Sequence, residues 1–180
     1  MNRREFVAAA ASVGVLGTGA AVATDRIDLR EPSDTATVEP IEIETLDGPG
    51  STAGSMAVPE HGRVTLVSVF ATWCRICEDS MPALGQVYDG YGDDVRFLSV
   101  SNEAIGGTVT RDDIVDWWER HDGRWPVGVD TDLALTAEFD VGTVPTTLVL
   151  GADNEVAWRS TGEKTVEELH SGIHGALGNP

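Results

Sequence analysis

The spacing of apolar residues along the chain alternates between the two-residue period of a strand and the 3.6-residue period of a helix. These changes mark the expected elements. Residues 64–70 form a mostly apolar and β-branched run, which predicts a buried strand. Residues 41–46 alternate apolar and polar positions, which is the period of a strand with one buried face. After turn residues around Gly48, residues 56–58 are expected to return as the second strand of a hairpin. Further strands are predicted at residues 95–100, 125–129, 146–150 and 155–160.

Helices are predicted between these strands and after the last one, at residues 76–91, 112–121, 132–139 and 165–177. Two of them have start signals. Thr110 is suited to cap the second helix, with Asp112 and Asp113 favourable in its first turn. Thr165 and Glu168 have the spacing of a capping box at the start of the last helix. These threonines therefore set the expected starts of both helices.

The first 40 residues differ in composition from the rest. Arg3, Arg4 and Phe6 precede an apolar run rich in Gly and Ala, which is typical of a Tat export signal. Ala21-Val22-Ala23 fits a cleavage site, although an uncleaved membrane anchor is the alternative. We therefore expect a Tat-type signal peptide at residues 1–23, a flexible acidic linker at 24–40 and the folded domain at 41–178.

The formal net charge of -18 and the pI of about 4.3 argue against nucleic-acid binding, which needs basic patches. Acidic residues are scattered along the chain, and Lys164 is the only lysine. We interpret this as the strongly hydrated surface of a halophilic protein, whose self-repulsion high salt screens. An acidic face for a cationic partner is the alternative.

The only two cysteines, Cys74 and Cys77, come directly after the apolar run of residues 64–70. They should lie where a strand ends and a helix begins. There, free backbone N–H groups and the helix dipole favour a thiolate, which is the reactive form of cysteine. A structural staple or half of a zinc site would be the inert alternative, but zinc needs about four ligands and no second cysteine pair exists.

Three motifs resemble the TlpA/ResA-type extracytoplasmic thiol–disulfide oxidoreductases of the thioredoxin superfamily. They are the run FATWC that ends at Cys74, the pair Met81-Pro82 and the run TVPTT around Pro145. The resemblance covers about residues 38–177. Together with the order of the elements, it implies a thioredoxin-like α/β fold. This fold has a mixed central sheet flanked by helices on both faces, an N-terminal β-hairpin and an inserted helix.

The same resemblance assigns roles to individual residues. Cys74 would be the nucleophile, with its sulfur exposed to a partner, and Cys77 the resolving thiol. Pro145 would follow a cis peptide bond beside the disulfide, leaving the Val144 backbone to pair with an extended substrate. Trp73 would lie on the rim around Cys74, with core packing as its alternative.

The motif departs from the family pattern at positions that tune the cysteines. Ser68 stands where thioredoxins have a buried Asp, so the Cys77 proton needs another acceptor. The inter-cysteine pair is Arg75-Ile76, neither Gly-Pro nor Pro-Pro. The positive charge of Arg75 favours a Cys74 thiolate, whereas the acidic residues after Cys77 oppose it. The sequence therefore leaves open whether the pair acts as a reductant or an oxidant.

The resemblance implies an exported enzyme that exchanges disulfides with exported proteins, of which apocytochrome c is one candidate, and that receives electrons from a membrane thiol donor. We expect no metal and no cofactor beyond the redox-active disulfide. His170 and His174 have a metal-ligand spacing, but surface or core histidines are favoured. The alternatives are a thiol peroxidase, whose cysteine pattern is missing before Cys74, and a copper-delivery module, which uses a wider cysteine spacing.

Overall fold

The computed structural model describes residues 37–178. The predicted signal peptide and all but the last four residues of the predicted linker lie outside this range. None of the helices within residues 37–178 combines the length and the apolar character needed to cross a membrane.

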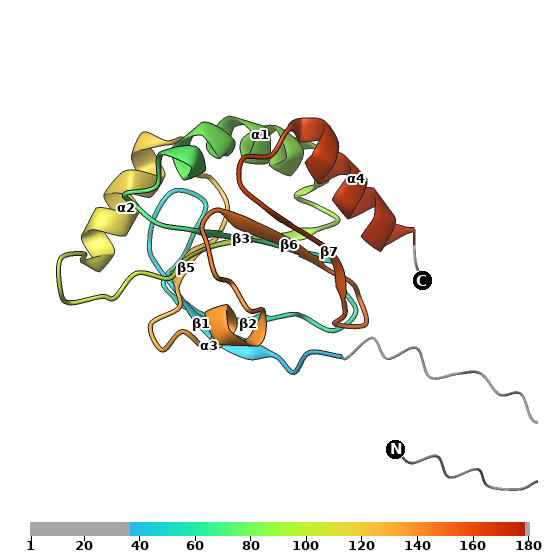
Figure 1. The fold of residues 1–180 in the computed structure, drawn as a ribbon, viewed down its shortest axis with the longest axis horizontal. Coiled ribbons are helices and arrows are strands. Elements are labelled where there is room, and N and C mark those ends of the chain that lie inside the picture. Colours follow the sequence, from blue (N-terminus) through green and yellow to red (C-terminus); the bar gives the residue numbers. More distant parts are fainter. Residues whose placement is uncertain (1–36, 179–180) are drawn as a thin grey trace, which may run out of the picture. The chain divides into compact units, whose positions relative to one another are not determined.

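Seven strands form one mixed sheet in the order β2-β1-β5-β4-β3-β6-β7 (Figure 1). Strands β3, β4 and β5 are parallel to one another, and β6 pairs antiparallel with β3. The hairpin strands β1 and β2 extend the sheet beyond β5, and β7 closes the other edge. The strands are β1 (Ile41–Thr45), β2 (Gly54–Val58), β3 (Thr65–Phe70), β4 (Arg96–Ser101), β5 (Val127–Val129), β6 (Thr146–Leu150) and β7 (Val156–Thr161).

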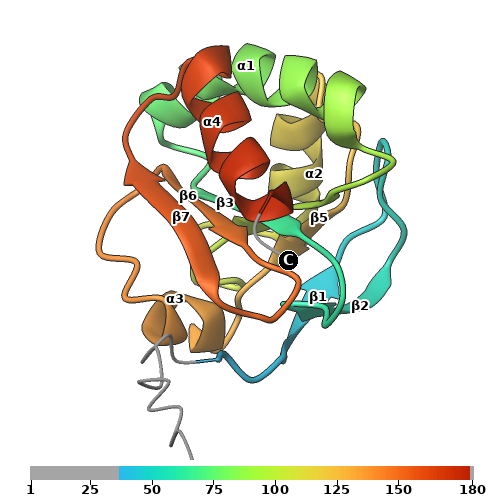
Figure 2. The same cartoon turned by 90° about the vertical axis from the view of Figure 1, so that its right-hand side faces the viewer.

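The helices divide unequally between the two faces of the sheet, as Figure 2 shows. Three of them cover one face and the short α3 lies on the other. They are α1 (Arg75–Tyr91), α2 (Arg111–Arg120), α3 (Ala134–Glu138) and α4 (Val166–Leu177). The prediction of a thioredoxin-like α/β fold with helices on both faces of a mixed sheet is confirmed.

The buried strand β3 supplies side chains to both halves of the core. Leu66 and Phe70 pack under α1, α2 and α4, whereas Val67 and Val69 pack on the side of α3. This alternation follows from the two-residue period of a strand. Because both faces are covered, every residue of β3 is buried, which explains its mostly apolar sequence.

The two predicted helix caps are confirmed. The side chain of Thr110 accepts a hydrogen bond from the backbone N–H of Asp113, and Thr165 does the same for Glu168. In return, each acidic side chain accepts from the backbone N–H of its threonine. Hydrogen bonds from the threonine side chain and backbone lower the pKa of Asp113, and those from Thr165 lower the pKa of Glu168.

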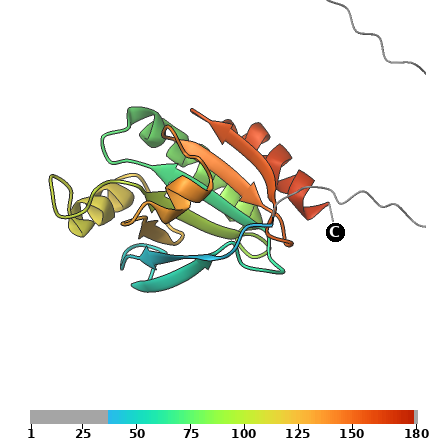
Figure 3. The ribbon, with the colours of Figure 1, turned by 60° about the horizontal axis from the view of Figure 1, so that its bottom comes forward.

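The N-terminal hairpin is fastened to the sheet through a serine in its connection. Ser51 Oγ donates to the carbonyl of Leu46 at 2.6 Å and accepts from the backbone N–H of Val127 at 3.1 Å. Strand β1 also pairs with β5 through Glu44 and Thr45. Figure 3 shows the hairpin, coloured blue to cyan, beside the rest of the sheet.

The packed domain starts earlier than predicted. Val38, placed in the flexible linker by the sequence analysis, is buried on the α3 side of the core. Its backbone N–H donates to the carbonyl of Asn154 at 3.0 Å. The linker prediction is therefore wrong at its C-terminal end, because a single valine among polar residues has no periodicity to reveal its burial.

Candidate active site

The two cysteines lie at the junction of the central strand β3 and helix α1. After β3, the backbone N–H of Cys74 donates to the carbonyl of Ala71, closing a turn. Cys74 is the N-cap of α1, and its Sγ accepts a hydrogen bond from the backbone N–H of Cys77 at 3.2 Å. A disulfide joins the two residues, whose Cα atoms are 5.2 Å apart. The sulfurs therefore lie at the positive end of the α1 dipole.

Cys74 is less exposed than the sequence analysis predicted. Cys74 is only 5% exposed and Cys77 2%, so the prediction of a well exposed nucleophile is corrected. The reason is that Cys74 is bonded to Cys77, which lies in the first turn of α1 and packs into the core. Trp73 and Ile76, in contrast, are 74% and 49% exposed. Trp73 therefore lies at the surface next to Cys74, in agreement with a rim position and not with core packing.

The segment before β6 lies at the same end of the sheet as the cysteines. Strand β6 runs antiparallel to β3, and Thr146 pairs with Val69, so the start of β6 lies beside the end of β3. The peptide bond between Val144 and Pro145 is cis. Val144 is half-buried and packs against the core cluster that contains both cysteines. The fold thus brings together the two motifs that are about 70 residues apart in the sequence.

The charged residues at the start of α1 point in different directions. Arg75 is exposed and lies 3.9 Å from Asp79, one turn along the helix. Glu78 Oε1 lies 4.0 Å from His121 Nε2, at the end of α2. The Arg75–Asp79 pair is exposed and contributes little energy, because water screens both charges. Arg75 consequently shares its charge with a carboxylate, which weakens its expected effect on Cys74.

Ser68 lies on the face of the sheet that α1 covers. It alternates with Val67 and Val69, which face α3, and is therefore on the same side as Phe70 and Cys77. Its neighbours across the sheet are Ser99 and Thr147, and all three are buried. This row contains hydroxyl groups and no carboxylate, so the sheet offers Cys77 no acidic proton acceptor here.

One acidic residue near the motif was missed by the sequence analysis. Glu103, just after β4, is only 9% exposed. Its carboxylate accepts hydrogen bonds from the backbone and side chain of Thr72, two residues before Cys74. A signal was available, because parallel neighbouring strands β3 and β4 end at the same edge of the sheet. A carboxylate directly after the second of them should therefore reach the loop after the first.

Comparisons with known proteins agree with this site. The chain matches the Redoxin family over residues 42–176, three quarters of its length. It is 26% identical over 108 residues to the thiol-disulfide oxidoreductase ResA of Bacillus cereus, which is 60% of either chain. Over 128 residues it is 23% identical to the sporulation thiol-disulfide oxidoreductase A of Bacillus subtilis, 71% of this chain and 73% of that one. The match thus spans about 60% of the length of the ResA relatives.

Solved structures show the same fold. The crystal structure of StoA from Bacillus subtilis superimposes with a TM-score of 0.64 at 20% identity, covering 77% of this chain and 99% of that one. A putative thiol:disulfide interchange protein DsbE from Chlorobium tepidum gives 0.61 at 18% identity, covering 79% and 99%. The chain therefore belongs to the Redoxin family and is a TlpA/ResA-like protein of the thioredoxin superfamily.

Proposed function

We propose that this protein is a thiol–disulfide oxidoreductase that exchanges disulfides with protein substrates through Cys74 and Cys77. The observation that carries the proposal is the disulfide at the N-terminus of α1, with the Val144-Pro145 segment at the same edge of the sheet. Cys74 is only 5% exposed in the disulfide, but its neighbours Trp73 and Ile76 lie at the surface, and the proposal requires that reduction opens the Cys74 sulfur to a partner. The relatives named thiol-disulfide oxidoreductases support this activity.

In the reducing direction, the Cys74 thiolate attacks one sulfur of a substrate disulfide. A mixed disulfide forms, and the first substrate sulfur leaves as a thiolate that takes up a proton. The Cys77 thiol then loses its proton and attacks the Cys74 sulfur, which releases the second substrate sulfur. Two electrons pass to the substrate, Cys74 and Cys77 end as a disulfide, and the substrate thiolates take up one proton released by Cys77 and one from solvent. A dithiol donor must reduce this disulfide before the next cycle.

The residues around the sulfurs support these steps. The N-terminus of α1 stabilises negative charge on Cys74, and the backbone N–H of Cys77 is already aimed at its sulfur. The exposed side chains of Trp73 and Ile76 offer apolar contact to a polypeptide next to the reacting sulfurs. Within residues 37–178, neither the N–H nor the C=O of Val144 forms a backbone hydrogen bond. Both groups are therefore free to pair with an extended substrate segment.

We further propose that the protein acts outside the cytoplasm, on exported proteins such as apocytochrome c, with a membrane thiol protein as its electron donor. The twin-arginine N-terminus supports this location. The scattered acidic charge supports a halophilic protein, whose stability should increase with salt concentration. Unfolding in urea at low and at molar potassium chloride would measure this dependence.

Insulin reduction by the purified chain, with dithiothreitol as donor, tests the activity. We expect catalysis by the wild-type protein, none by Cys74→Ser, and a trapped mixed disulfide with Cys77→Ser, because only the second variant keeps the attacking sulfur. The two serine variants are matched controls for each other, since each loses one sulfur of the same pair. Equal rates for wild type and Cys74→Ser would refute the proposal.

A further inference from the structure

Glu103 connects the strand next to β3 with the turn that carries Cys74. Its Oε2 accepts from the backbone N–H of Thr72 at 2.7 Å and from Ser101 Oγ at 3.0 Å. Its Oε1 accepts from Thr72 Oγ1 at 2.9 Å. Both carboxylate oxygens thus accept hydrogen bonds from Thr72 or Ser101. Thr72 therefore depends on Glu103 for its backbone and its side-chain hydrogen bond.

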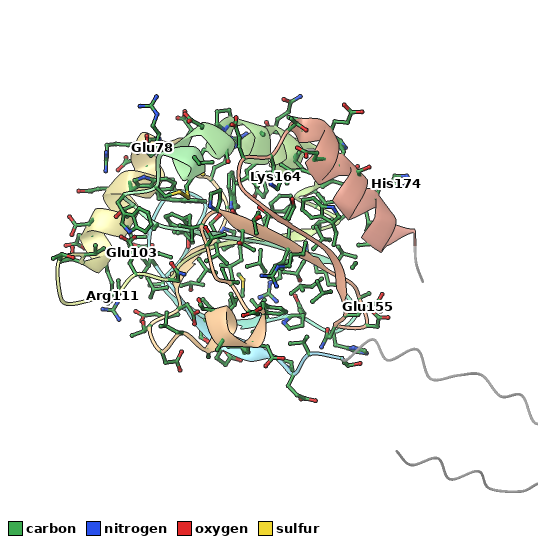
Figure 4. All side chains as sticks on the ribbon, viewed as in Figure 1. Glu78, Glu103, Arg111, Glu155, Lys164 and His174 are labelled. Carbon is green, nitrogen blue, oxygen red and sulfur yellow. A yellow bond between two sulfur atoms is a disulfide. The ribbon has the colours of Figure 1, made fainter. Side chains whose placement is uncertain are left out.

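This anchor lies close to the reacting sulfur. Only Trp73 separates Thr72 from Cys74, so the Glu103 carboxylate and the Cys74 sulfur lie on the order of 10 Å apart. The turn between them is closed by the hydrogen bond from Cys74 to the carbonyl of Ala71. Figure 4 shows Glu103 at the same side of the fold as Glu78, the residue after Cys77. The position of Cys74 is thus fixed on one side by α1 and on the other by Glu103.

The charge of Glu103 is not neutralised by an ion pair within residues 37–178. The other charged groups near the motif are more exposed: Arg75 lies beside Asp79 in solvent, and Glu78 faces His121. A charge that is almost buried is screened less than an exposed one and acts over a longer distance. Water therefore screens the charge of Glu103 less than those of Arg75, Asp79 and Glu78. Asp130, after β5, is buried more deeply, but its carboxylate accepts from the backbone N–H groups of Leu135 and Thr136 at α3.

We propose that Glu103 is a positioning residue that holds the turn of Cys74 and makes the cysteine pair more reducing. This inference rests on the proposed function. It assigns the Cys74/Cys77 pair the role of a reductant, which the sequence left open. Reduction of the disulfide adds two electrons and leaves Cys74 as a thiolate. A fixed negative charge nearby opposes the thiolate but hardly affects the neutral disulfide. The oxidised form is therefore favoured, and the dithiol form gives up its electrons more readily.

The substitution Glu103→Gln separates charge from position. The glutamine oxygen can accept from the Thr72 N–H and from Ser101, while its NH₂ group donates to the Thr72 hydroxyl, which can reverse its role. The hydrogen bonds are thereby kept and only the charge is lost. Glu155→Gln is the matched control, because Glu155 follows β6 at the end of the sheet remote from Pro145 (Figure 4).

Two readouts measure the effect of the charge. A unit charge at about 10 Å, with an effective dielectric constant of about 20, changes an ionisation equilibrium by about tenfold. In Glu103→Gln, the midpoint of the pH profile of Cys74 alkylation should therefore fall by about one pH unit. The equilibrium with glutathione, measured above that midpoint, should shift about tenfold toward the dithiol, equivalent to about 30 mV. Glu155→Gln should leave both values unchanged.

Thr72→Val and Thr72→Ser test the positioning role. Valine removes one of the two Thr72 hydrogen bonds to Glu103, and we expect a lower melting temperature and a change in the glutathione equilibrium, both restored by serine. A purely structural role would lower the melting temperature of the oxidised and reduced forms equally, without moving the equilibrium. Identical potentials and alkylation profiles for Glu103→Gln and Glu155→Gln would overturn the proposal. Because neither readout uses a client protein, this result is independent of the insulin assay.

Discussion

Cys74 has a structural role that can be measured apart from its chemistry. As the N-cap of α1 it has an extended backbone, with φ of -91° and ψ of 101°, and its Sγ accepts from the Cys77 N–H at 3.2 Å. Serine provides a good capping oxygen at such a position, whereas alanine provides no acceptor. Both substitutions abolish the disulfide and leave Cys77 as a free thiol, so the difference between them isolates the cap.

We expect Cys74→Ser to be more stable than Cys74→Ala by about 1 kcal/mol, within a range of about 0.5–2 kcal/mol. Burial of the serine hydroxyl opposes this difference, but the hydroxyl oxygen is satisfied by the Cys77 N–H, so the cap dominates. Urea unfolding under reducing conditions measures it. With a slope of about 2 kcal/mol/M, the midpoints should differ by about 0.5 M. Equal midpoints, or a higher midpoint for alanine, would show that the α1 cap contributes nothing.

Three further predictions concern the pH dependence, the hairpin and the surface. Because its hydrogen bonds with Thr165 lower the pKa of Glu168, the wild-type advantage over Glu168→Gln should be present above the unfolded pKa of about 4.5 and lost as the pH falls through the folded pKa. Urea midpoints measured between pH 3 and 7 check this dependence. Ser51→Ala should cost about 2 kcal/mol in urea unfolding, because it leaves the buried N–H of Val127 without its acceptor; a cost below about 0.5 kcal/mol would contradict this. Trp73→Ala should change stability by less than about 0.5 kcal/mol but slow insulin reduction, since the side chain is exposed beside Cys74; an unchanged rate would exclude a role in substrate contact.

Much of the fold could be predicted because its signals are local. The starts of α2 and α4 follow from the threonine caps, and the buried strand β3 follows from its mostly apolar, β-branched run. Contacts between distant segments carry no comparable signal. The pairing of β1 with β5 joins residues more than 80 positions apart, and the burial of Val38 depends on a packing partner far along the chain.

The same distinction applies to the site. Cys74 and Cys77 share one turn, so the sequence places them correctly at the strand–helix junction. Glu103 is 31 residues from Thr72, and its role appears only once β3 and β4 are aligned in parallel. The low exposure of Cys74 was also missed, because spacing predicts which face of an element a residue occupies and not how closely its neighbours pack.

The convergence of Thr72, Glu103 and Pro145 on one sheet edge has a consequence for the nascent protein. These residues are supplied by the ends of β3 and β4 and the beginning of β6, which is the last of the three strands to be synthesised. Until that strand is added, Val144 and Pro145 cannot lie beside the end of β3, and we expect Cys74 to react as an ordinary thiol. We therefore expect the labelling rate of Cys74 to change when β6 joins the sheet, so that this rate reports completion of the sheet.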